Sequence, residues 1–438
     1  MATGTNANQN GRTNGATIED ALAKRAKQRA LMIAVDTTGE QTLDELGELL
    51  RTAGVVTAGQ MMQRRSEPDP DRYFGQGKLE EAKEEIARTG ANLVACDDEL
   101  APRQERNLEA ALGVPVIDRT AVILDIFADH AHSAEGKLQV ELAQLEYNLA
   151  RMRGLWTHLE RLGAGIGTRG PGESQIETDR RLARDRIAAL RRRLRGVEQN
   201  RGVMRSRRQD SSLPQVALAG YTNAGKSTLL NALTGATVSI GDRLFHTLDP
   251  TTRAYEFESR RYLITDTVGF IDKLPHQLVE AFKATLEETV LSDLIVHVVD
   301  ATSSEEQMAM EMAAAESILG EIGADDKPRL LVLNKVDLLE PEQRSEVRIA
   351  HPDAVQVSAV TGEGLEELKA AIELTFEETM MPIELLVPYA DGARLHDLHE
   401  VAGKVEREDG PEGVLVRTRL PMGELHRFAD LEVTGSAP

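Results

Sequence analysis

The sequence predicts an α/β protein in which two strand–helix units flank an antiparallel helical hairpin, with a small α+β segment at the C-terminus. Three observations predict this fold class. Short apolar runs alternate with amphipathic stretches both before and after the middle of the chain. The middle itself changes to a heptad spacing of apolar residues. The length of 438 residues is sufficient for roughly three domains.

The composition excludes several classes of protein. Hydrophobic residues make up 41% and charged residues 28%, as in an ordinary globular protein. The single cysteine, Cys96, excludes an internal disulfide scaffold. No apolar run approaches the roughly 20 residues of a membrane span, and the first residues carry no apolar signal segment. We therefore expect a cytoplasmic protein without membrane insertion, beginning with a disordered tail over residues 1–27.

Residues 28–133 are predicted to form an N-terminal α/β domain. Four short apolar runs in this region are rich in β-branched side chains and lie at residues 31–35, 54–59, 92–96 and 114–118. Amphipathic stretches lie between them, so that strand and helix patterns alternate. This order is typical of a small parallel sheet.

Residues 134–210 are predicted to form the helical hairpin. One apolar seam has alternating spacings of four and three residues, at Leu138, Leu142, Leu145, Leu149, Met152, Trp156 and Leu159. A second seam repeats this spacing at Ala183, Ile187, Leu190, Leu194 and Val197. The glycine-rich segment 163–174 between them predicts a loop at the tip. A hairpin that closes its own seam favours a monomer.

The second arm of the hairpin is strongly basic within an acidic chain. The net charge of the whole chain is −21, yet Arg180 to Arg208 holds twelve arginines and two acids, a local charge of +10. An overall acidic protein repels nucleic acid on average, so we expect no DNA partner. A concentrated arginine stripe can still dock on RNA in a salt-dependent way, and a merely solvated helix face is the alternative. The candidate RNA contacts are Arg169 at the tip and Arg180, Arg181, Arg184, Arg191, Arg192, Arg193 and Arg195 on the arm.

Residues 214–380 are predicted to form a larger α/β domain with a phosphate-binding loop. Gly220–Ser227 matches the pattern G-x-x-x-x-G-K-[ST], follows a strand-like run and opens a helix-like one. The glycines let successive backbone N–H groups face a phosphate, Lys226 neutralises phosphate oxygens, and the Ser227 hydroxyl suits Mg²⁺. The residues expected to contact the nucleotide here are Gly220, Tyr221, Thr222, Asn223, Ala224, Gly225, Lys226, Ser227 and Thr228.

Three further segments, each at the end of a predicted strand, indicate which nucleotide binds. Asp266, Thr267, Val268 and Gly269 bring a carboxylate near the metal and an N–H near the γ-phosphate. Asn334, Lys335, Val336 and Asp337 offer a carboxylate to the N1–H and 2-amino groups of guanine, donors that adenine lacks. Ser358, Ala359 and Val360 can present backbone N–H groups to the guanine O6. Together these segments predict a P-loop GTPase domain that binds GTP or GDP with Mg²⁺.

The remaining residues, 381–438, are predicted to form a small C-terminal α+β domain. After Met381-Pro382 the sequence shows an apolar run, an amphipathic stretch and a second apolar run. This pattern indicates a strand, a helix and a strand.

The order of these motifs resembles the translation-factor-related GTPases, and several segments resemble the HflX family in particular. The segments are GYTNAGKSTLLNALTG, LFHTLDPTTR, DTVGFI, EGKLQVELAQLEY and GIGTRGPGESQIETDRR. The resemblance extends over about residues 28–438 and includes the parts outside the GTPase domain. It implies a GTPase that associates with RNA and proteins of the large (50S) ribosomal subunit and that splits or rescues stalled ribosomes under stress.

The resemblance also implies a switch segment after the phosphate loop. Its members are Phe245, His246, Thr247, Leu248 and Asp249. Thr247 is the preferred second Mg²⁺ ligand beside Ser227, and Thr251 and Thr252 remain alternatives. Such segments are ordered by the γ-phosphate and the metal and are released after hydrolysis.

One position departs from the small-GTPase pattern. Phe270 follows Gly269 where Ras-like proteins carry the glutamine that orients the attacking water. A phenyl ring cannot orient water, so we expect slow hydrolysis in isolation and stimulation by the ribosome, and we name no catalytic base. The alternative function is a GTP-regulated protein-binding module that does not act on the ribosome; salt-insensitive association with a protein would favour it.

Overall fold

The structure is a computed structural model that describes residues 28–39, 42–152, 171–209, 213–235, 244, 245, 248, 250–257, 260–273, 286, 288–378, 380–402, 405–420 and 424–433. The chain divides into two compact units, Met1–Ile126 and Phe127–Pro438. No helix in the described ranges is long and apolar enough to cross a membrane.

The first unit contains the predicted parallel sheet. Its strands lie in the order β2-β1-β3-β4 and are β1 (Arg29–Asp36), β2 (Val56–Arg64), β3 (Leu93–Cys96) and β4 (Val116–Asp118). The connecting helices are α2 (Asp44–Thr52), α3 (Gln76–Thr89) and α4 (Pro102–Leu112), and α5 (Arg119–His130) continues into the second unit. β2 starts two residues later than the sequence predicts, because Gly54 takes a left-handed φ of 77° after α2.

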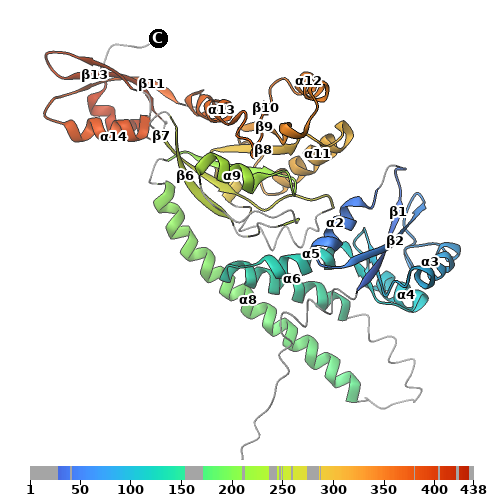
Figure 1. Ribbon diagram of the computed structural model, residues 1–438. Helices are drawn as coiled ribbons and strands as arrows, with labels where there is room; N and C mark the ends of the chain where they lie inside the picture. Colours follow the sequence, from blue (N-terminus) through green and yellow to red (C-terminus); the bar gives the residue numbers. More distant parts are fainter. Residues whose placement is uncertain are drawn as a thin grey trace, which may run out of the picture. The chain divides into compact units, whose positions relative to one another are not determined.

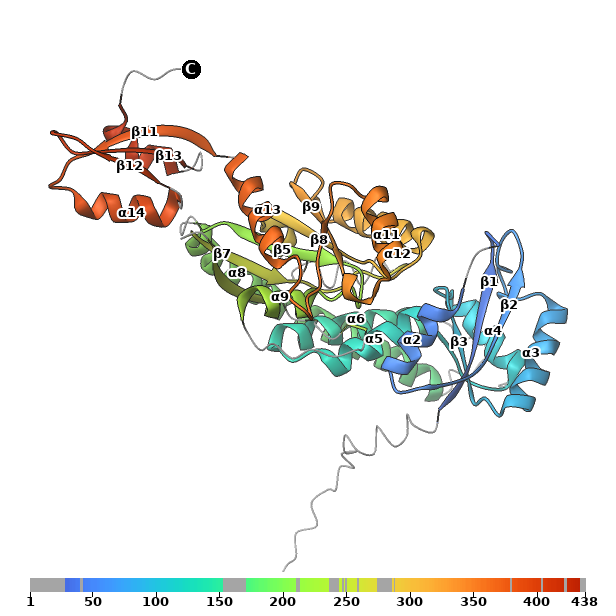
Figure 2. The same ribbon diagram turned by 45° about the horizontal axis from the view of Figure 1, so that its top comes forward.

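The helical hairpin consists of α6 (Ala134–Met152) and α8 (Pro171–Gln209), which lie side by side in both ribbon views (Figures 1 and 2). The predicted seams pack together through Leu138, Leu142, Leu145, Leu149, Ile187, Leu190 and Leu194. Trp156 and Leu159 lie outside the described residues. α8 begins at Pro171, inside the segment predicted as loop, because proline at the first position of a helix is already fixed at a helical φ.

The predicted GTPase domain is built on a six-stranded sheet in the order β10-β9-β8-β5-β7-β6. The strands are β5 (Gln215–Gly220), β6 (Thr251–Phe257), β7 (Arg260–Asp266), β8 (Leu294–Asp300), β9 (Arg329–Asn334) and β10 (Val355–Gln356). Only β6, at one edge, runs antiparallel to its neighbour. The helices are α9 (Lys226–Thr234), α11 (Glu305–Glu321), α12 (Pro341–Ala350) and α13 (Leu365–Glu378). The carboxyl ends of the parallel strands therefore meet at one edge of the sheet.

The C-terminal segment forms a three-stranded antiparallel sheet in the order β11-β13-β12. Its elements are β11 (Met381–Val387), α14 (Gly392–Ala402), β12 (Glu406–Asp409), β13 (Val414–Leu420) and α15 (Leu425–Phe428). Leu385, Leu398, Val416 and Phe428 form its core. β12 is absent from the sequence prediction, because its four residues are all charged and exposed and carry no hydrophobic period.

Candidate nucleotide-binding site and arginine stripe

The phosphate loop connects β5 to α9 and needs glycine at both ends. Gly220 has a φ of 147°, and a Cβ added there would lie 2.1 Å from the carbonyl oxygen of Val298. Gly225 has a φ of 92°, and its Cβ would lie 2.3 Å from the side-chain nitrogen of Asn334. Backbone conformation and close packing both exclude larger residues. The loop is therefore held tightly between neighbouring strand ends.

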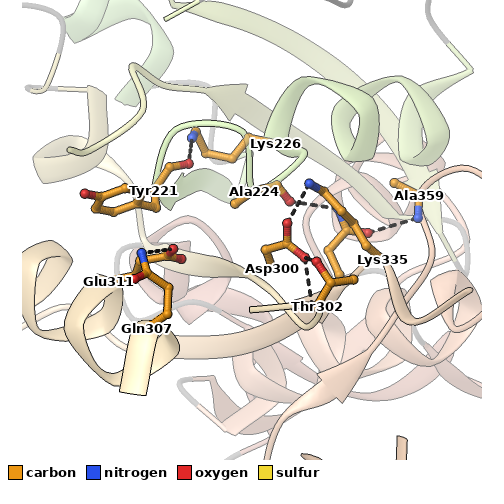
Figure 3. A network of polar contacts seen from close by, with 10 residues as sticks. Tyr221, Ala224, Lys226, Asp300, Thr302, Gln307, Glu311, Lys335 and Ala359 are labelled. Carbon is orange, nitrogen blue, oxygen red and sulfur yellow. Dashed lines mark hydrogen bonds and ion pairs between the residues drawn. The ribbon is translucent and has the colours of Figure 1, made fainter. Parts of the chain in front are cut away.

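Lys226 is oriented by the loop that it follows. Its Nζ donates a hydrogen bond to the carbonyl oxygen of Gly220 at 3.0 Å. It donates a second one to the carbonyl oxygen of Tyr221 at 2.7 Å (Figure 3). An ammonium group has three hydrogens, so one donor remains for a phosphate oxygen. Burial lowers the pKa of Lys226 to about 8, against the opposing charges of Asp266 and Glu311. The loop carbonyls therefore fix the position of this cation.

Ser227 and Asp266 bring two oxygen donors together beside this lysine. Ser227 Oγ donates to Asp266 Oδ2 at 2.5 Å, and Asp266 is buried. A hydroxyl and a carboxylate fit a hard cation such as Mg²⁺. Within the described ranges no group of three or more His, Cys, Asp or Glu side chains could hold a metal.

The predicted switch segment is described only in part. His246, Thr247 and Asp249 lie outside the described residues. Phe245 and Leu248 are buried, and the ring of Phe245 packs edge-on against Phe127 with centroids 4.6 Å apart. The side chain of Phe245 therefore serves packing in this structure.

The two alternative threonines belong to the sheet. Thr251 pairs with Asp266 in the ladder between β6 and β7, and Thr252 Oγ1 lies 2.9 Å from Thr265 Oγ1. The hydroxyl of Thr252 is thus engaged by a neighbouring strand.

The segment after Asp266 lies against the phosphate loop. Thr267 Oγ1 donates to the carbonyl oxygen of Leu218 at 2.7 Å, and Val268 is buried. Phe270 is only 1% exposed, and its N–H donates to the carbonyl oxygen of Gly220 at 3.0 Å. The phenyl ring therefore belongs to the core of the domain and leaves no side chain at this position to orient water.

Asn334 joins three loops at the other end of the site. It is 1% exposed, its Nδ2 donates to the carbonyl oxygen of Ala224 at 2.9 Å, and its Oδ1 accepts from the N–H of Ala359 at 3.1 Å. Lys335 takes a left-handed φ of 67° and donates from Nζ to Asp300 Oδ2 at 2.6 Å (Figure 3). Asp300 is not among the residues predicted from the sequence to form the site, although its position at the end of an apolar strand is a usable signal.

The predicted base-contacting groups differ in their availability. Asp337 is exposed in the 3₁₀ turn Val336–Leu338. The N–H of Ser358 donates to the carbonyl oxygen of Glu363 at 2.9 Å, and that of Ala359 is bonded to Asn334. The N–H of Val360, a residue that is 79% exposed, donates no hydrogen bond to any described residue. Of the three backbone donors expected to face a guanine O6, only that of Val360 is not already used.

The arginines of α8 whose side chains the structure describes differ in whether they are paired. Arg186 pairs with Glu141 and Arg191 with Glu146, each at 2.7 Å across the hairpin. Arg180 is half-buried, and Arg169 lies outside the described residues. Five others are exposed and have no polar partner among the described residues, namely Arg181, Arg184, Arg192, Arg193 and Arg195. Three of these five also line a groove of about 650 Å³ beside the seam: Arg184, Arg192 and Arg195.

Three family models match consecutive segments of the chain. Residues 40–128 match the family described as GTP-binding GTPase N-terminal, residues 130–208 the GTP-binding GTPase Middle Region, and residues 215–335 the 50S ribosome-binding GTPase family.

Two curated relatives share the name GTPase HflX. The protein of Lacrimispora saccharolytica is 45% identical over 412 residues, which is 93% of this chain and 97% of that protein. The protein of Escherichia coli K12 is 42% identical over 416 residues, again 93% of this chain and 97% of that protein. A solved GTP-binding protein from Sulfolobus solfataricus in complex with GDP is 27% identical, with a TM-score of 0.41, and the match covers 79% of this chain and 98% of that one.

Proposed function

The chain belongs to the HflX family of GTPases. On that premise we propose that its GTP cycle controls docking of the arginine stripe on the large (50S) ribosomal subunit, and that this docking splits or rescues stalled ribosomes. The arginine stripe is defined here as Arg181, Arg184, Arg192, Arg193 and Arg195. The chain is a GTP hydrolase of this family. The residues that bind the nucleotide, the metal ion and RNA are proposed below from the contacts of their side chains.

Lys226, Ser227 and Asp337 carry the proposed nucleotide site. Backbone N–H groups of Gly220–Thr228 surround the phosphates, and the remaining hydrogen of the Lys226 ammonium meets the β- and γ-phosphate oxygens. Asp337 accepts from the N1–H and 2-amino groups of guanine. The observation that carries this proposal is that Asn334 bonds the phosphate loop to the two base-recognition loops, so that the two ends of one nucleotide are held in register.

Mg²⁺ is proposed to bind at Ser227, with Thr247 as the second protein ligand. Such a metal ion would neutralise phosphate charge and hold the triphosphate in one geometry. The contact between Ser227 and Asp266 supports this choice, because the carboxylate orients the hydroxyl oxygen that would face the metal.

The arginine stripe is the proposed RNA-binding surface. Its unpaired guanidinium groups can contact RNA phosphates without losing an internal ion pair. Arg169 belongs to the same proposal, whereas Arg191 is already bonded to Glu146. Phosphate contacts need no base sequence, which suits a folded RNA surface.

The domain organisation is also part of the proposal. We assign the N-terminal α/β domain to residues 28–133, the hairpin to 134–210, the GTPase domain to 214–380 and the C-terminal domain to 381–438. The apolar seam between α6 and α8 is closed within one chain, which supports a monomer. We propose that it acts in the cytoplasm, where the ribosome is its partner.

The first test is GTP hydrolysis with and without purified large subunits at two salt concentrations. We expect strong stimulation that weakens at high salt. The variant R184Q/R192Q/R195Q should lose most of the stimulation while keeping the basal rate. A matched control, R88Q/R103Q/R348Q, removes the same charge from exposed positions elsewhere and should behave as the wild type.

The alternative function predicts a different outcome. A GTP-regulated protein-binding module would hydrolyse GTP at the same rate with or without large subunits. Its association with a protein partner would be insensitive to salt and to the three arginine substitutions. That result would remove the ribosome as the immediate partner.

A further inference from the structure

The ladder between β5 and β7 continues beyond both strands into the phosphate loop. Gly220 and Thr222 bond to Phe270 on either side: the N–H of Phe270 donates to Gly220 at 3.0 Å, and the N–H of Thr222 donates to the carbonyl oxygen of Phe270 at 2.8 Å. Tyr221 forms a parallel bridge with Phe270. The backbone after Gly269 is therefore joined to the loop that would hold the phosphates.

The side chain of Tyr221 adds one more bond, farther along this segment. The N–H of Asp272 donates to the phenol oxygen of Tyr221 at 2.6 Å. Tyr221 is 5% exposed, and Ile271, which lies between Phe270 and Asp272, is also buried. Asp272 itself is half-buried, so water competes only in part for this bond, and the hydroxyl contributes to where the backbone lies.

This bond acts close to the reacting end of a bound triphosphate. A Cβ on Gly269 would lie 2.8 Å from Thr222 Cγ2 and 3.1 Å from Lys226 Nζ. The backbone of Gly269 thus lies beside the ammonium group that would hold the γ-phosphate. Because Gly269 directly precedes the segment 270–272, a bond that holds this segment in place also holds the N–H of Gly269 in place.

We propose that Tyr221 is a positioning residue for GTP hydrolysis, whose hydroxyl holds the segment Gly269–Asp272 against the phosphate loop through the N–H of Asp272. The role is specific to the triphosphate, because GDP has no γ-phosphate for the Gly269 N–H to contact. The position of this backbone segment matters more in this chain because Phe270 supplies no polar side chain that could orient the attacking water. The inference rests on the proposed nucleotide site.

The test is the substitution Y221F, which removes the hydroxyl and keeps the ring. We expect kcat for GTP hydrolysis to fall about fivefold, as for the loss of one buried hydrogen bond that matters in the transition state. The KM for GTP and the Kd for GDP should stay within about twofold of the wild type. The matched control is Y255F, because the buried hydroxyl of Tyr255 in the same domain has no hydrogen-bond partner among the residues that the structure describes, and its loss should leave hydrolysis unchanged.

A second measurement reports on the bond itself. Amide hydrogen exchange of the peptide covering residues 268–273 should be faster in Y221F than in the wild type and unchanged in Y255F. Unchanged exchange together with unchanged kcat would overturn the inference. An equal loss of GTP and GDP affinity in Y221F would also overturn it, since that pattern indicates a general structural role.

The variant K226A separates this inference from the proposed site. If K226A loses binding of both nucleotides and Y221F behaves as the wild type, only the role of Tyr221 is wrong. If K226A still binds GDP normally, the proposed nucleotide site itself is wrong.

Discussion

The side-chain nitrogen of Asn334 lies 2.9 Å from the carbonyl oxygen of Ala224, so the end of β9 is bonded directly to the phosphate loop. The same side chain accepts a hydrogen bond from Ala359, in the loop that follows β10. Three loops from different strands are aligned by one buried amide. This amide therefore fixes the spacing between the phosphate and base ends of the proposed site.

The substitution N334A should weaken both nucleotides alike. It leaves the carbonyl of Ala224 and the N–H of Ala359 buried without their partner, which costs about 1–3 kcal/mol of unfolding free energy. We expect the Kd values for GTP and GDP to rise together by about tenfold or more. Fluorescent nucleotide titration and urea unfolding measure the two effects. L338A, at an exposed position on the same loop, is the control, and an unaltered GDP Kd in N334A would contradict the alignment role.

The substitution D337N should change the base that is recognised. An amide cannot accept both the N1–H and the 2-amino hydrogen of guanine, so GTP affinity should fall about 100-fold or more. Xanthine carries a carbonyl where guanine carries the amino group, and the new amide can donate to it. Competition binding with XTP should therefore show recovery in D337N alone. If XTP binds D337N no better than GTP does, Asp337 is not the base-contacting residue.

Nucleotide affinity should depend on the charge of Lys226. Burial holds the pKa of Lys226 at about 8, and a bound phosphate would raise that pKa by stabilising the ammonium form. Binding therefore takes up a proton once the pH exceeds 8. GDP affinity should be flat between pH 6.5 and 7.5 and should fall by up to tenfold per pH unit above pH 8. In K226R the guanidinium stays charged, so calorimetric titrations of that variant should show weaker binding without this pH slope.

Binding to the large subunit should release counterions at the arginine stripe. Each phosphate contact contributes roughly 0.7–0.9 to the slope of log affinity against log salt concentration. Removing Arg184, Arg192 and Arg195 should therefore reduce that slope by about two. R186Q is the control on the same helix, because Arg186 is already paired with Glu141. Equal slopes for the triple variant and the wild type would exclude the groove as an RNA contact.

Much of this architecture follows from local pattern in the sequence. Gly220 and Gly225 flank a loop between a strand and a helix, and only such residues allow the observed φ angles. The seam of α6 and α8 follows from its heptad spacing, and the parallel strands from their apolar runs.

Other features depend on contacts that no local pattern encodes. The pairing of Arg191 with Glu146 joins residues 45 positions apart, so the sequence alone could not separate this arginine from the unpaired Arg192. The use of the Ala359 N–H by Asn334 and the bond between Tyr221 and Asp272 likewise require the folded sheet. Most residues of these loops can be predicted from the sequence, but the hydrogen bonds between them cannot.

The antiparallel edge strand β6 is constrained in how it could shift along β7. β6 pairs with β7 from Thr251 opposite Asp266 to Phe257 opposite Arg260, and Tyr255 stacks on Tyr262 with ring centroids 5.0 Å apart. A slip of one residue would turn Tyr255 to the opposite face, whereas a slip of two restores it. A register shift of this strand that keeps Tyr255 on the same face would therefore have to cover two residues, about 6.8 Å.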